Sequence, residues 1–221
     1  FSKLYENVNR VRFMNEIQLH AVPWQHAILD DFLTGNSLDD LLEFWNTVPK
    51  NSRWESTVFR QAFDKEGNFI DLWFTQSFIK DLKEVMEPEL IKRIYEEVSL
   101  KVRSVGTLLD AQLDDEDAFV IDVQYINRHT SYPFHIDASD KLLTLITFIH
   151  PDKNVGTLIG NDKDALKTGY RETEWKPNRA LVFKPDDTTW HAFRADGRNR
   201  RMTLNINIYK KINSPTGRVE T

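Results

Sequence analysis

The sequence predicts a mainly β protein of the α+β class, with helices of the first half packed on one sheet of a β-sandwich or barrel. Two stretches in the first half, 37–45 and 77–105, place apolar side chains at helical spacing. From Ala118 onward, short apolar segments are separated by turns rich in Asp, Asn, Gly and Pro. Helices followed by a run of short antiparallel strands are typical of a sandwich or barrel with helices on one sheet.

The domain organisation follows from what the 221 residues lack. They contain no low-complexity linker, no internal repeat and no block of like charge long enough to form a tail. We therefore expect a single domain over 1–221. Its helical support should occupy about residues 1–110 and its catalytic β core about residues 118–210.

The first half is predicted to hold a strand around 27–29 and then a helix. Ser37 is a suitable N-cap for that helix, and Leu38, Leu41, Leu42 and Trp45 form its apolar stripe. A β-hairpin is expected next, with its turn at 65–68. Residues 77–105 indicate two helices interrupted near Pro88.

The second half predicts a series of strands, with the longest at its start and end. Their sequences are "AFVIDVQYI", "KLLTLITFIH", "GTLIG", "RETEWK", "RALVF", "TTWHAF" and "RRMTLNINIY". Turn-forming residues separate each strand from the next. This spacing is the basis for the predicted β core.

Composition excludes several classes of site. The chain has no Cys, which excludes disulfides, cysteine nucleophiles, iron–sulfur clusters and thiolate zinc sites. A net charge of −5 with interspersed acids and bases disfavours a nucleic-acid-binding protein. No apolar run approaches the length of a membrane span, so we expect a cytoplasmic protein that binds neither nucleic acid nor membrane. The oligomeric state stays open.

Three potential metal ligands occur within the predicted β core. "YPFHID" contains His135 and Asp137, which point to the same side if they share a strand, and His191 follows 54 residues later. Two histidines and one carboxylate are the facial donor set of non-heme Fe(II) oxygenases, which leave positions open for a cosubstrate and O2. The same donors can also hold Zn²⁺ in a hydrolase.

The last predicted strand has one polar face. Strand alternation gives this face Arg201, Thr203, Asn205, Asn207 and Tyr209, whereas the opposite face is apolar. Such a polar row cannot pack into an apolar core without partners. It is suited to line a pocket for an anion, because an Arg guanidinium makes two charge-assisted hydrogen bonds to a carboxylate.

In combination, these motifs resemble the 2-oxoglutarate/Fe(II)-dependent oxygenases, and specifically their prolyl-4-hydroxylase-like branch. "QYINRHTSYPFHID" is similar to the Tyr-x6-Tyr-x2-His-x-Asp segment of that branch, with Tyr125 and Tyr132 on its two tyrosines. The segments "AILDDFLTG", "KLLTLITFIHP", "VGTLIG" and "KPNRALVFKPDDTTWHAF" match further motifs in order. The resemblance covers roughly residues 22–210.

The resemblance implies a double-stranded β-helix, or jelly-roll, core with the N-terminal helices packed on one sheet. It implies Fe(II) held by His135, Asp137 and His191, with 2-oxoglutarate and O2 as cosubstrates and ascorbate as a candidate reductant. Arg201 would bind the C5 carboxylate of 2-oxoglutarate, aided by Tyr125, Thr203 or Asn205. The implied reaction is hydroxylation of a C–H bond, with release of succinate and CO2.

The substrate is left open by these motifs. Peptidyl or free proline, or another amino acid, is favoured, and any small molecule or peptide is compatible. The substrate pocket should include Tyr132, Phe148 and Asn207. Phe148 stands where some relatives carry a tyrosine that helps to bind 2-oxoglutarate, so this hydroxyl is missing. The resemblance also implies that segments 54–74 and 161–170 hold the substrate.

Two other function classes compete with the oxygenase. A zinc hydrolase would use the same three ligands but would leave the Arg-x-Thr strand unexplained. A non-catalytic jelly-roll binding module would be expected to have lost a ligand, whereas this chain keeps all three.

Overall fold

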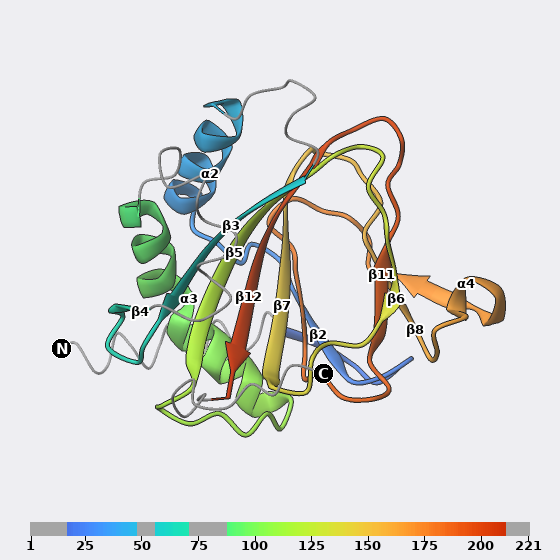
Figure 1. Cartoon of the computed structure of the whole chain (residues 1–221), viewed down its shortest axis with the longest axis horizontal. Coiled ribbons are helices and arrows are strands. Elements are labelled where there is room, and N and C mark those ends of the chain that lie inside the picture. The colour runs from blue at the N-terminus through green and yellow to red at the C-terminus, as the bar shows by residue number, and fades with distance from the viewer. Residues whose placement is uncertain (1–16, 48–55, 71–87, 211–221) are drawn as a thin grey trace, which may run out of the picture.

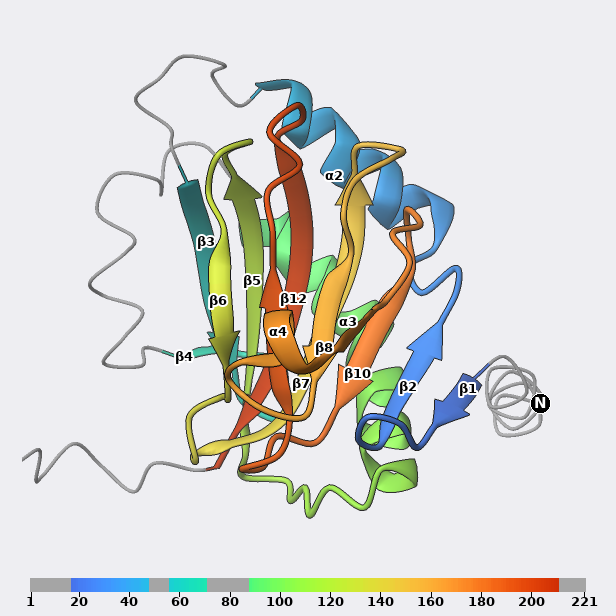
Figure 2. The ribbon, with the colours of Figure 1, turned by 90° about the vertical axis from the view of Figure 1, so that its right-hand side faces the viewer.

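The computed structural model describes residues 17–47, 56–70 and 88–210. Within these ranges the chain forms two antiparallel sheets that face each other, with two long helices on the outside of the larger sheet (Figures 1 and 2). The larger sheet has the strand order β1-β2-β10-β7-β12-β5-β3-β4, and the smaller has the order β6-β11-β8-β9.

From β5 onward the strands alternate between the two sheets, except that β8 and β9 both belong to the smaller sheet. The larger sheet contains β1 (Ile17–His20), β2 (His26–Leu29), β3 (Ser56–Phe63), β4 (Phe69–Ile70), β5 (Ala118–Ile126), β7 (Lys141–His150), β10 (Ala180–Phe183) and β12 (Arg201–Tyr209). The smaller contains β6 (Tyr132–His135), β8 (Thr157–Gly160), β9 (Tyr170–Glu172) and β11 (Trp190–Phe193). This alternation closes the two sheets around a shared interior.

The main core lies between the larger sheet and the helices α2 (Gly35–Thr47) and α3 (Pro88–Leu108). The apolar face of β12 contributes Met202, Leu204, Ile206 and Ile208 to it, each almost fully buried. Proline suits the first position of α3, because the backbone N–H that it lacks would have no partner there. Figure 2 shows α3 behind the larger sheet, on the side away from β6 and β8.

A second apolar cluster lies between the two sheets. It joins the inner-face residues Ile146, Phe148 and Phe183 to Ile159 of the smaller sheet and to Trp175. Phe148 stacks on Trp175 with ring centroids 4.6 Å apart. This cluster fills one end of the interior and leaves the other end open for polar side chains.

Most predicted elements are confirmed, with corrections at their ends. The strands "AFVIDVQYI" and "KLLTLITFIH" form with the predicted limits. Of the predicted strand "RETEWK", only Arg171 and Glu172 belong to β9, which begins at Tyr170. The predicted cap Ser37 is wrong: α2 begins two residues earlier, at Gly35. Glu97 of α3 accepts hydrogen bonds from Ser37 and Thr34, which ties the two helices together.

Two further segments differ from expectation or lie outside the described ranges. A short helix, α4 (Ala165–Thr168), occupies part of a segment that was expected to be a loop. The predicted helix before Pro88 falls on 71–87, which lies outside the described residues. In the ranges that the structure describes, no helix is both long enough and apolar enough to span a membrane.

Candidate active site

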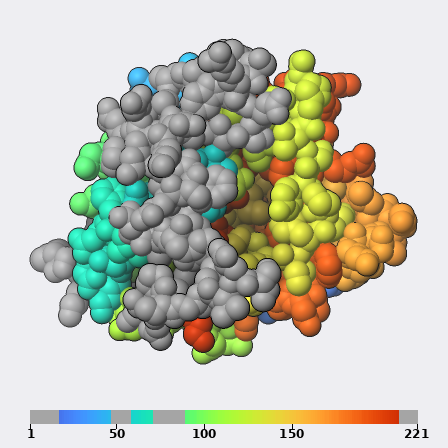
Figure 3. Space-filling model, viewed as in Figure 1, coloured from blue at the N-terminus to red at the C-terminus, as the bar shows by residue number. Residues whose placement is uncertain are grey.

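A cavity of about 570 Å³ lies between the two sheets at the end that the apolar cluster leaves open. Inward-facing residues of β3, β5, β7 and β12 form its floor, and residues of β6 and β11 form its opposite wall. Figure 3 shows the surface hollowed beside the yellow-green segment that contains β6. The cavity volume is in the range of small-molecule sites.

The three predicted metal ligands meet on the wall of this cavity. β6 and β11 pair antiparallel, with His135 directly opposite His191, so the two imidazole rings lie 4.2 Å apart. Asp137 follows two residues after the end of β6, in a loop and not in the strand that was predicted. One ligand atom from each of the three residues lies within 4.8 Å of the others.

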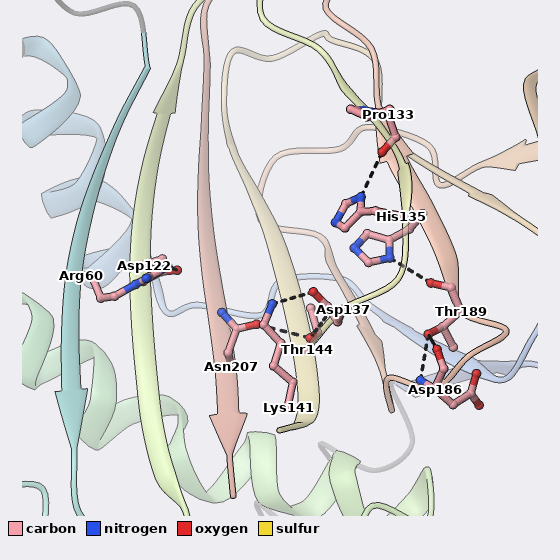
Figure 4. A network of polar contacts seen from close by, with 11 residues as sticks. Arg60, Asp122, Pro133, His135, Asp137, Lys141, Thr144, Asp186, Thr189 and Asn207 are labelled. Carbon is pink, nitrogen blue, oxygen red and sulfur yellow. Dashed lines mark hydrogen bonds and ion pairs between the residues drawn. The ribbon is translucent and has the colours of Figure 1, made fainter. Parts of the chain in front are cut away.

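Backbone carbonyls orient both imidazoles. Nδ1 of His135 lies 3.0 Å from the Pro133 carbonyl oxygen, and Nδ1 of His191 lies 3.0 Å from that of Thr189 (Figure 4). A neutral imidazole that donates from Nδ1 keeps the lone pair of Nε2 for a metal. Burial lowers the pKa of His191 to about 4, which favours this neutral form.

Asp137 is held by two neighbours that sequence reasoning did not identify. Lys141 Nζ lies 2.6 Å from one carboxylate oxygen, and the Thr144 hydroxyl donates to the other at 2.7 Å (Figure 4). Burial by itself would raise the pKa of Asp137, but the Lys141 charge and the hydrogen bonds from Lys141 and Thr144 hold it below its ordinary value. The carboxylate is therefore ionised, as a metal ligand must be.

Arg201 is a buried cation at the edge of the same cavity. Only 4% of the residue is exposed, and burial lowers the pKa of its guanidinium to about 10. Among the described residues, no carboxylate lies within ion-pair distance of it, and its Nε has no hydrogen-bond partner. A buried guanidinium in this state provides a strong site for an anion.

Two aromatic rings and one carbonyl position the Arg201 side chain. The guanidinium carbon lies 4.9 Å from the Trp175 ring centroid and 4.7 Å from that of Phe193, so both rings contribute cation–π contacts. Nη1 donates to the Val155 carbonyl at 3.3 Å. The next residue, Gly156, packs closely against the Thr173 backbone, because a Cβ there would lie 1.6 Å from the Thr173 carbonyl oxygen.

The other predicted site residues divide into two groups. Thr203, Asn205 and Asn207 line the cavity beside Arg201, as strand alternation predicted, and Asn205 Oδ1 is buried without a partner. Tyr132 lines the mouth, half exposed, with its ring edge-on to His135.

Tyr125 and Phe148 do not line the cavity. In the pairing of β5 with β12, Tyr125 stands opposite Met202, so its side chain faces the main core, and its hydroxyl accepts a hydrogen bond from Arg200. Gln124 takes the cavity-facing position opposite Thr203. Phe148 is fully buried beneath Trp175 and so supports Arg201 only indirectly.

Two segments, 54–74 and 161–170, were expected to hold the substrate. Of the first, the structure describes 56–70, and within that range Val58 and Arg60 line the cavity. No residue of 161–170 lines it. Arg60 and Asp122 form a bidentate pair on the floor, with both nitrogen–oxygen distances 2.6 Å (Figure 4). Sequence reasoning missed this pair, because the two residues are 62 positions apart and no motif contains them.

No known family model matches the sequence. No curated protein matches it either. Similarity to known proteins is therefore found in the fold, by comparison with solved structures.

Several prolyl hydroxylases have similar structures. A Pseudomonas putida prolyl-4-hydroxylase is 13% identical with a TM-score of 0.54, over 84% of this chain and 92% of that one. A viral collagen prolyl hydroxylase of Paramecium Bursaria Chlorella virus-1, in its 2OG complex, is 16% identical with a TM-score of 0.52. This match covers 83% of this chain and 94% of that one.

A third similar structure is a Trichoplax adhaerens prolyl hydroxylase in complex with a peptide fragment of the hypoxia inducible factor oxygen degradation domain. It is 13% identical with a TM-score of 0.54, over 94% of this chain and 92% of that one. All three matches extend over most of both chains. The chain therefore shares the jelly-roll fold of these prolyl hydroxylases, which confirms the predicted β core.

Proposed function

We propose that this protein is a 2-oxoglutarate- and Fe(II)-dependent dioxygenase that hydroxylates a C–H bond of a small molecule or peptide. The observation that carries the proposal is the buried, carboxylate-free guanidinium of Arg201 in the same cavity as the His135, Asp137 and His191 cluster. A metal centre and an anion site in one cavity are what a chelating dicarboxylate cosubstrate requires.

The three ligand residues fit an iron ion. Both imidazoles are oriented by Nδ1 contacts, and the Asp137 carboxylate is ionised. Two nitrogens and one carboxylate oxygen leave coordination positions open on the cavity side. Bound there together, Fe(II), 2-oxoglutarate and O2 would supply the oxidising power for hydroxylation, with succinate and CO2 as the other products.

The Arg201 end of the cavity fits the distal carboxylate of the 2-oxoglutarate molecule. The Trp175 and Phe193 rings hold the guanidinium in place and exclude water from it, so a charge-assisted pair there is strong. The Thr203 hydroxyl and the Asn205 amide lie along the same strand face and can complete the contacts. Gln124 takes the role that was first assigned to Tyr125, because it faces the cavity.

The similar structures support a proline or amino-acid substrate. One of them is described with 2OG and another with a peptide fragment, which is consistent with a cavity that holds a cosubstrate and part of a substrate. The carboxylate ligand Asp137 favours hydroxylation over halogenation, since related halogenases lack this residue.

The proposal is tested by metal binding and by 2-oxoglutarate turnover in air. The wild type should bind one Mn²⁺ in calorimetry and release succinate with Fe(II), whereas His191→Ala should lose both and keep its circular dichroism spectrum. His129→Ala, at an exposed histidine whose imidazole accepts a hydrogen bond from Arg128, is the matched control and should behave as wild type.

Each alternative gives a different result in the same assay. A zinc hydrolase would bind metal but release no succinate with Fe(II). A non-catalytic binding module would release no succinate with any metal. Full activity in His191→Ala would remove the ligand assignment.

A further inference from the structure

The charged groups that line the cavity do not balance. Among the described residues, three cations, Arg60, Lys141 and Arg201, face two carboxylates, Asp122 and Asp137. Arg60 and Asp122 neutralise each other through their bidentate pair. The remaining groups are Asp137 with Lys141, and Arg201 without a carboxylate.

Filling the site as proposed above releases Lys141 from its partner. A divalent metal brings two positive charges and 2-oxoglutarate brings two negative ones, so these two ligands cancel. Asp137 becomes a metal ligand, and Arg201 pairs with the cosubstrate. The cavity is then left with one positive charge, and that charge is the ammonium of Lys141.

The position of Lys141 makes this excess charge costly. Its side chain is only 17% exposed, and Nζ lies 2.6 Å from an oxygen of the carboxylate that the metal would bind. A metal dication would repel the ammonium and compete with it for the same carboxylate. A poorly solvated ammonium without a counter-charge is unfavourable, so a negative group beside the metal centre would be bound strongly.

We propose that Lys141 binds a free carboxylate of the substrate, so that the substrate is a small carboxylic acid, such as a free amino acid, and not an interior residue of a peptide. This inference rests on the proposed dioxygenase function. The flexible Lys141 stem lets the ammonium turn from Asp137 toward the cavity while it stays beside the reacting centre. A cavity of about 570 Å³ can hold 2-oxoglutarate and one such acid.

The test compares each acid with its own primary amide. Succinate release is measured with Fe(II) over free amino acids and simple monocarboxylates, each paired with its uncharged amide. Loss of one charge-assisted pair should lower kcat/KM for the amide by about 10- to 150-fold. Lys141→Met should raise the KM for the acid by a similar factor and leave the 2-oxoglutarate KM within about twofold, because Arg201 still binds that cosubstrate.

A binding measurement without turnover separates substrate contact from support of Asp137. The protein, loaded with Mn²⁺ and 2-oxoglutarate without O2, is titrated calorimetrically with each acid of the panel. Lys141→Met should lose this binding and keep its Mn²⁺ site, whereas Lys141→Arg, which keeps the charge, should retain part of it. Lys184→Met, at an exposed lysine whose ammonium contacts the Asp110 carbonyl, is the control and should match wild type.

The outcomes separate this inference from the proposed function. If amides or internal peptides are hydroxylated as well as the acids, or if no acid binds in a Lys141-dependent way, the substrate assignment is overturned while the dioxygenase function stands. Loss of Mn²⁺ binding in Lys141→Met would show that the lysine only supports Asp137. Absence of any Fe(II)-dependent succinate release would remove the proposed function itself.

Discussion

The buried charges of Arg201 and Asp137 are accommodated in this cavity in two different ways. Asp137 is compensated directly, by an ion pair with Lys141 and a hydrogen bond from Thr144. Arg201 has only aromatic rings and one carbonyl around its guanidinium. The buried guanidinium of Arg201 can therefore still bind an anion, and the carboxylate of a cosubstrate would bind there.

Arg201→Gln is expected to raise the 2-oxoglutarate KM by about 10- to 150-fold, because it removes a charge-assisted pair worth about 1.5–3 kcal/mol. Arg201→Lys should raise the 2-oxoglutarate KM nearly as much, since a point charge does not reproduce the guanidinium fork. Mn²⁺ affinity should be unchanged in both variants. Steady-state kinetics and calorimetry measure the two quantities.

Arg200→Gln is the control for this prediction. Arg200 donates to the Tyr125 hydroxyl at 2.6 Å, and Tyr125 belongs to the main core on the other side of the sheet. Loss of the Arg200 guanidinium should leave the 2-oxoglutarate KM unchanged. A large effect at Arg200 together with a small one at Arg201 would contradict the assignment of the anion site.

Among the elements, the hairpin of β3 and β4 has a turn that is anchored to a helix. Its turn packs on α3: the Tyr95 hydroxyl donates to the Asp64 carbonyl at 3.0 Å, and Gly67 lies against the Tyr95 ring. Within the described range 56–70, the residues that line the cavity are Val58 and Arg60, which lie on β3 before the turn. The turn thus anchors the edge of the larger sheet to a helix, and its contacts are structural.

Gly67→Ala is expected to lower the free energy of unfolding by about 1–3 kcal/mol, because its φ of 78° disfavours a side chain. The new Cβ would also lie 2.8 Å from a Tyr95 ring atom. Gly197→Ala separates the two causes, since Gly197 has a φ of 72° but open space around it. Urea unfolding should show a smaller loss for Gly197→Ala, and equal losses would mean that the Tyr95 contact costs nothing.

A pair of ionic contacts fastens the end of β2 to the turn before β10. The Arg179 guanidinium donates to Asp30 at 2.7 and 3.1 Å, and Lys176 lies 3.0 Å from the same carboxylate. The hydrogen bond from Arg179 is the main cause that lowers the pKa of Asp30 below 3.8. A carboxyl group whose pKa is lower in the folded state stabilises the protein at pH values above its pKa in the unfolded state. This stabilisation is lost as the pH falls through the pKa of the folded state.

We expect Asp30→Asn to destabilise the protein at about pH 6 and to have progressively less effect as the pH falls through the lowered pKa of Asp30, because the wild-type carboxylate then becomes protonated in the folded state. Urea unfolding over this pH range measures the difference. Asp115→Asn, at an exposed aspartate, is the control. An effect of Asp30→Asn that did not change with pH would show that the charge of Asp30 is not what stabilises the junction.

For the whole molecule, a metal ion would couple parts of the chain that are far apart in sequence. The three proposed ligands come from β6, from the loop that follows it and from β11, so a bound metal would stabilise the pairing of these strands. Mn²⁺ at about 100 times its Kd should stabilise the folded state by about 2.7 kcal/mol and raise Tm by about 5–10 °C. His191→Ala should show no such rise in a thermal melt, and an equal rise would place the metal elsewhere.

The sequence by itself determined the features that depend on local order. Strand alternation predicted the cavity-facing row of β12, because side chains two residues apart point to the same side of a strand. The order of helices and short strands predicted the two-sheet core. The spacing of His135, Asp137 and His191 identified three residues that the fold brings within 4.8 Å of one another.

Only the tertiary structure decided which other residues meet in the cavity. Tyr125 was predicted to contact the cosubstrate, but the pairing of β5 with β12 turns Gln124 inward, and a register difference of one residue exchanges the two faces of a strand. Lys141, Trp175 and the Arg60–Asp122 pair reach the site from separate strands and loops. Contacts of this kind depend on sheet pairing between distant segments, which local sequence patterns do not specify.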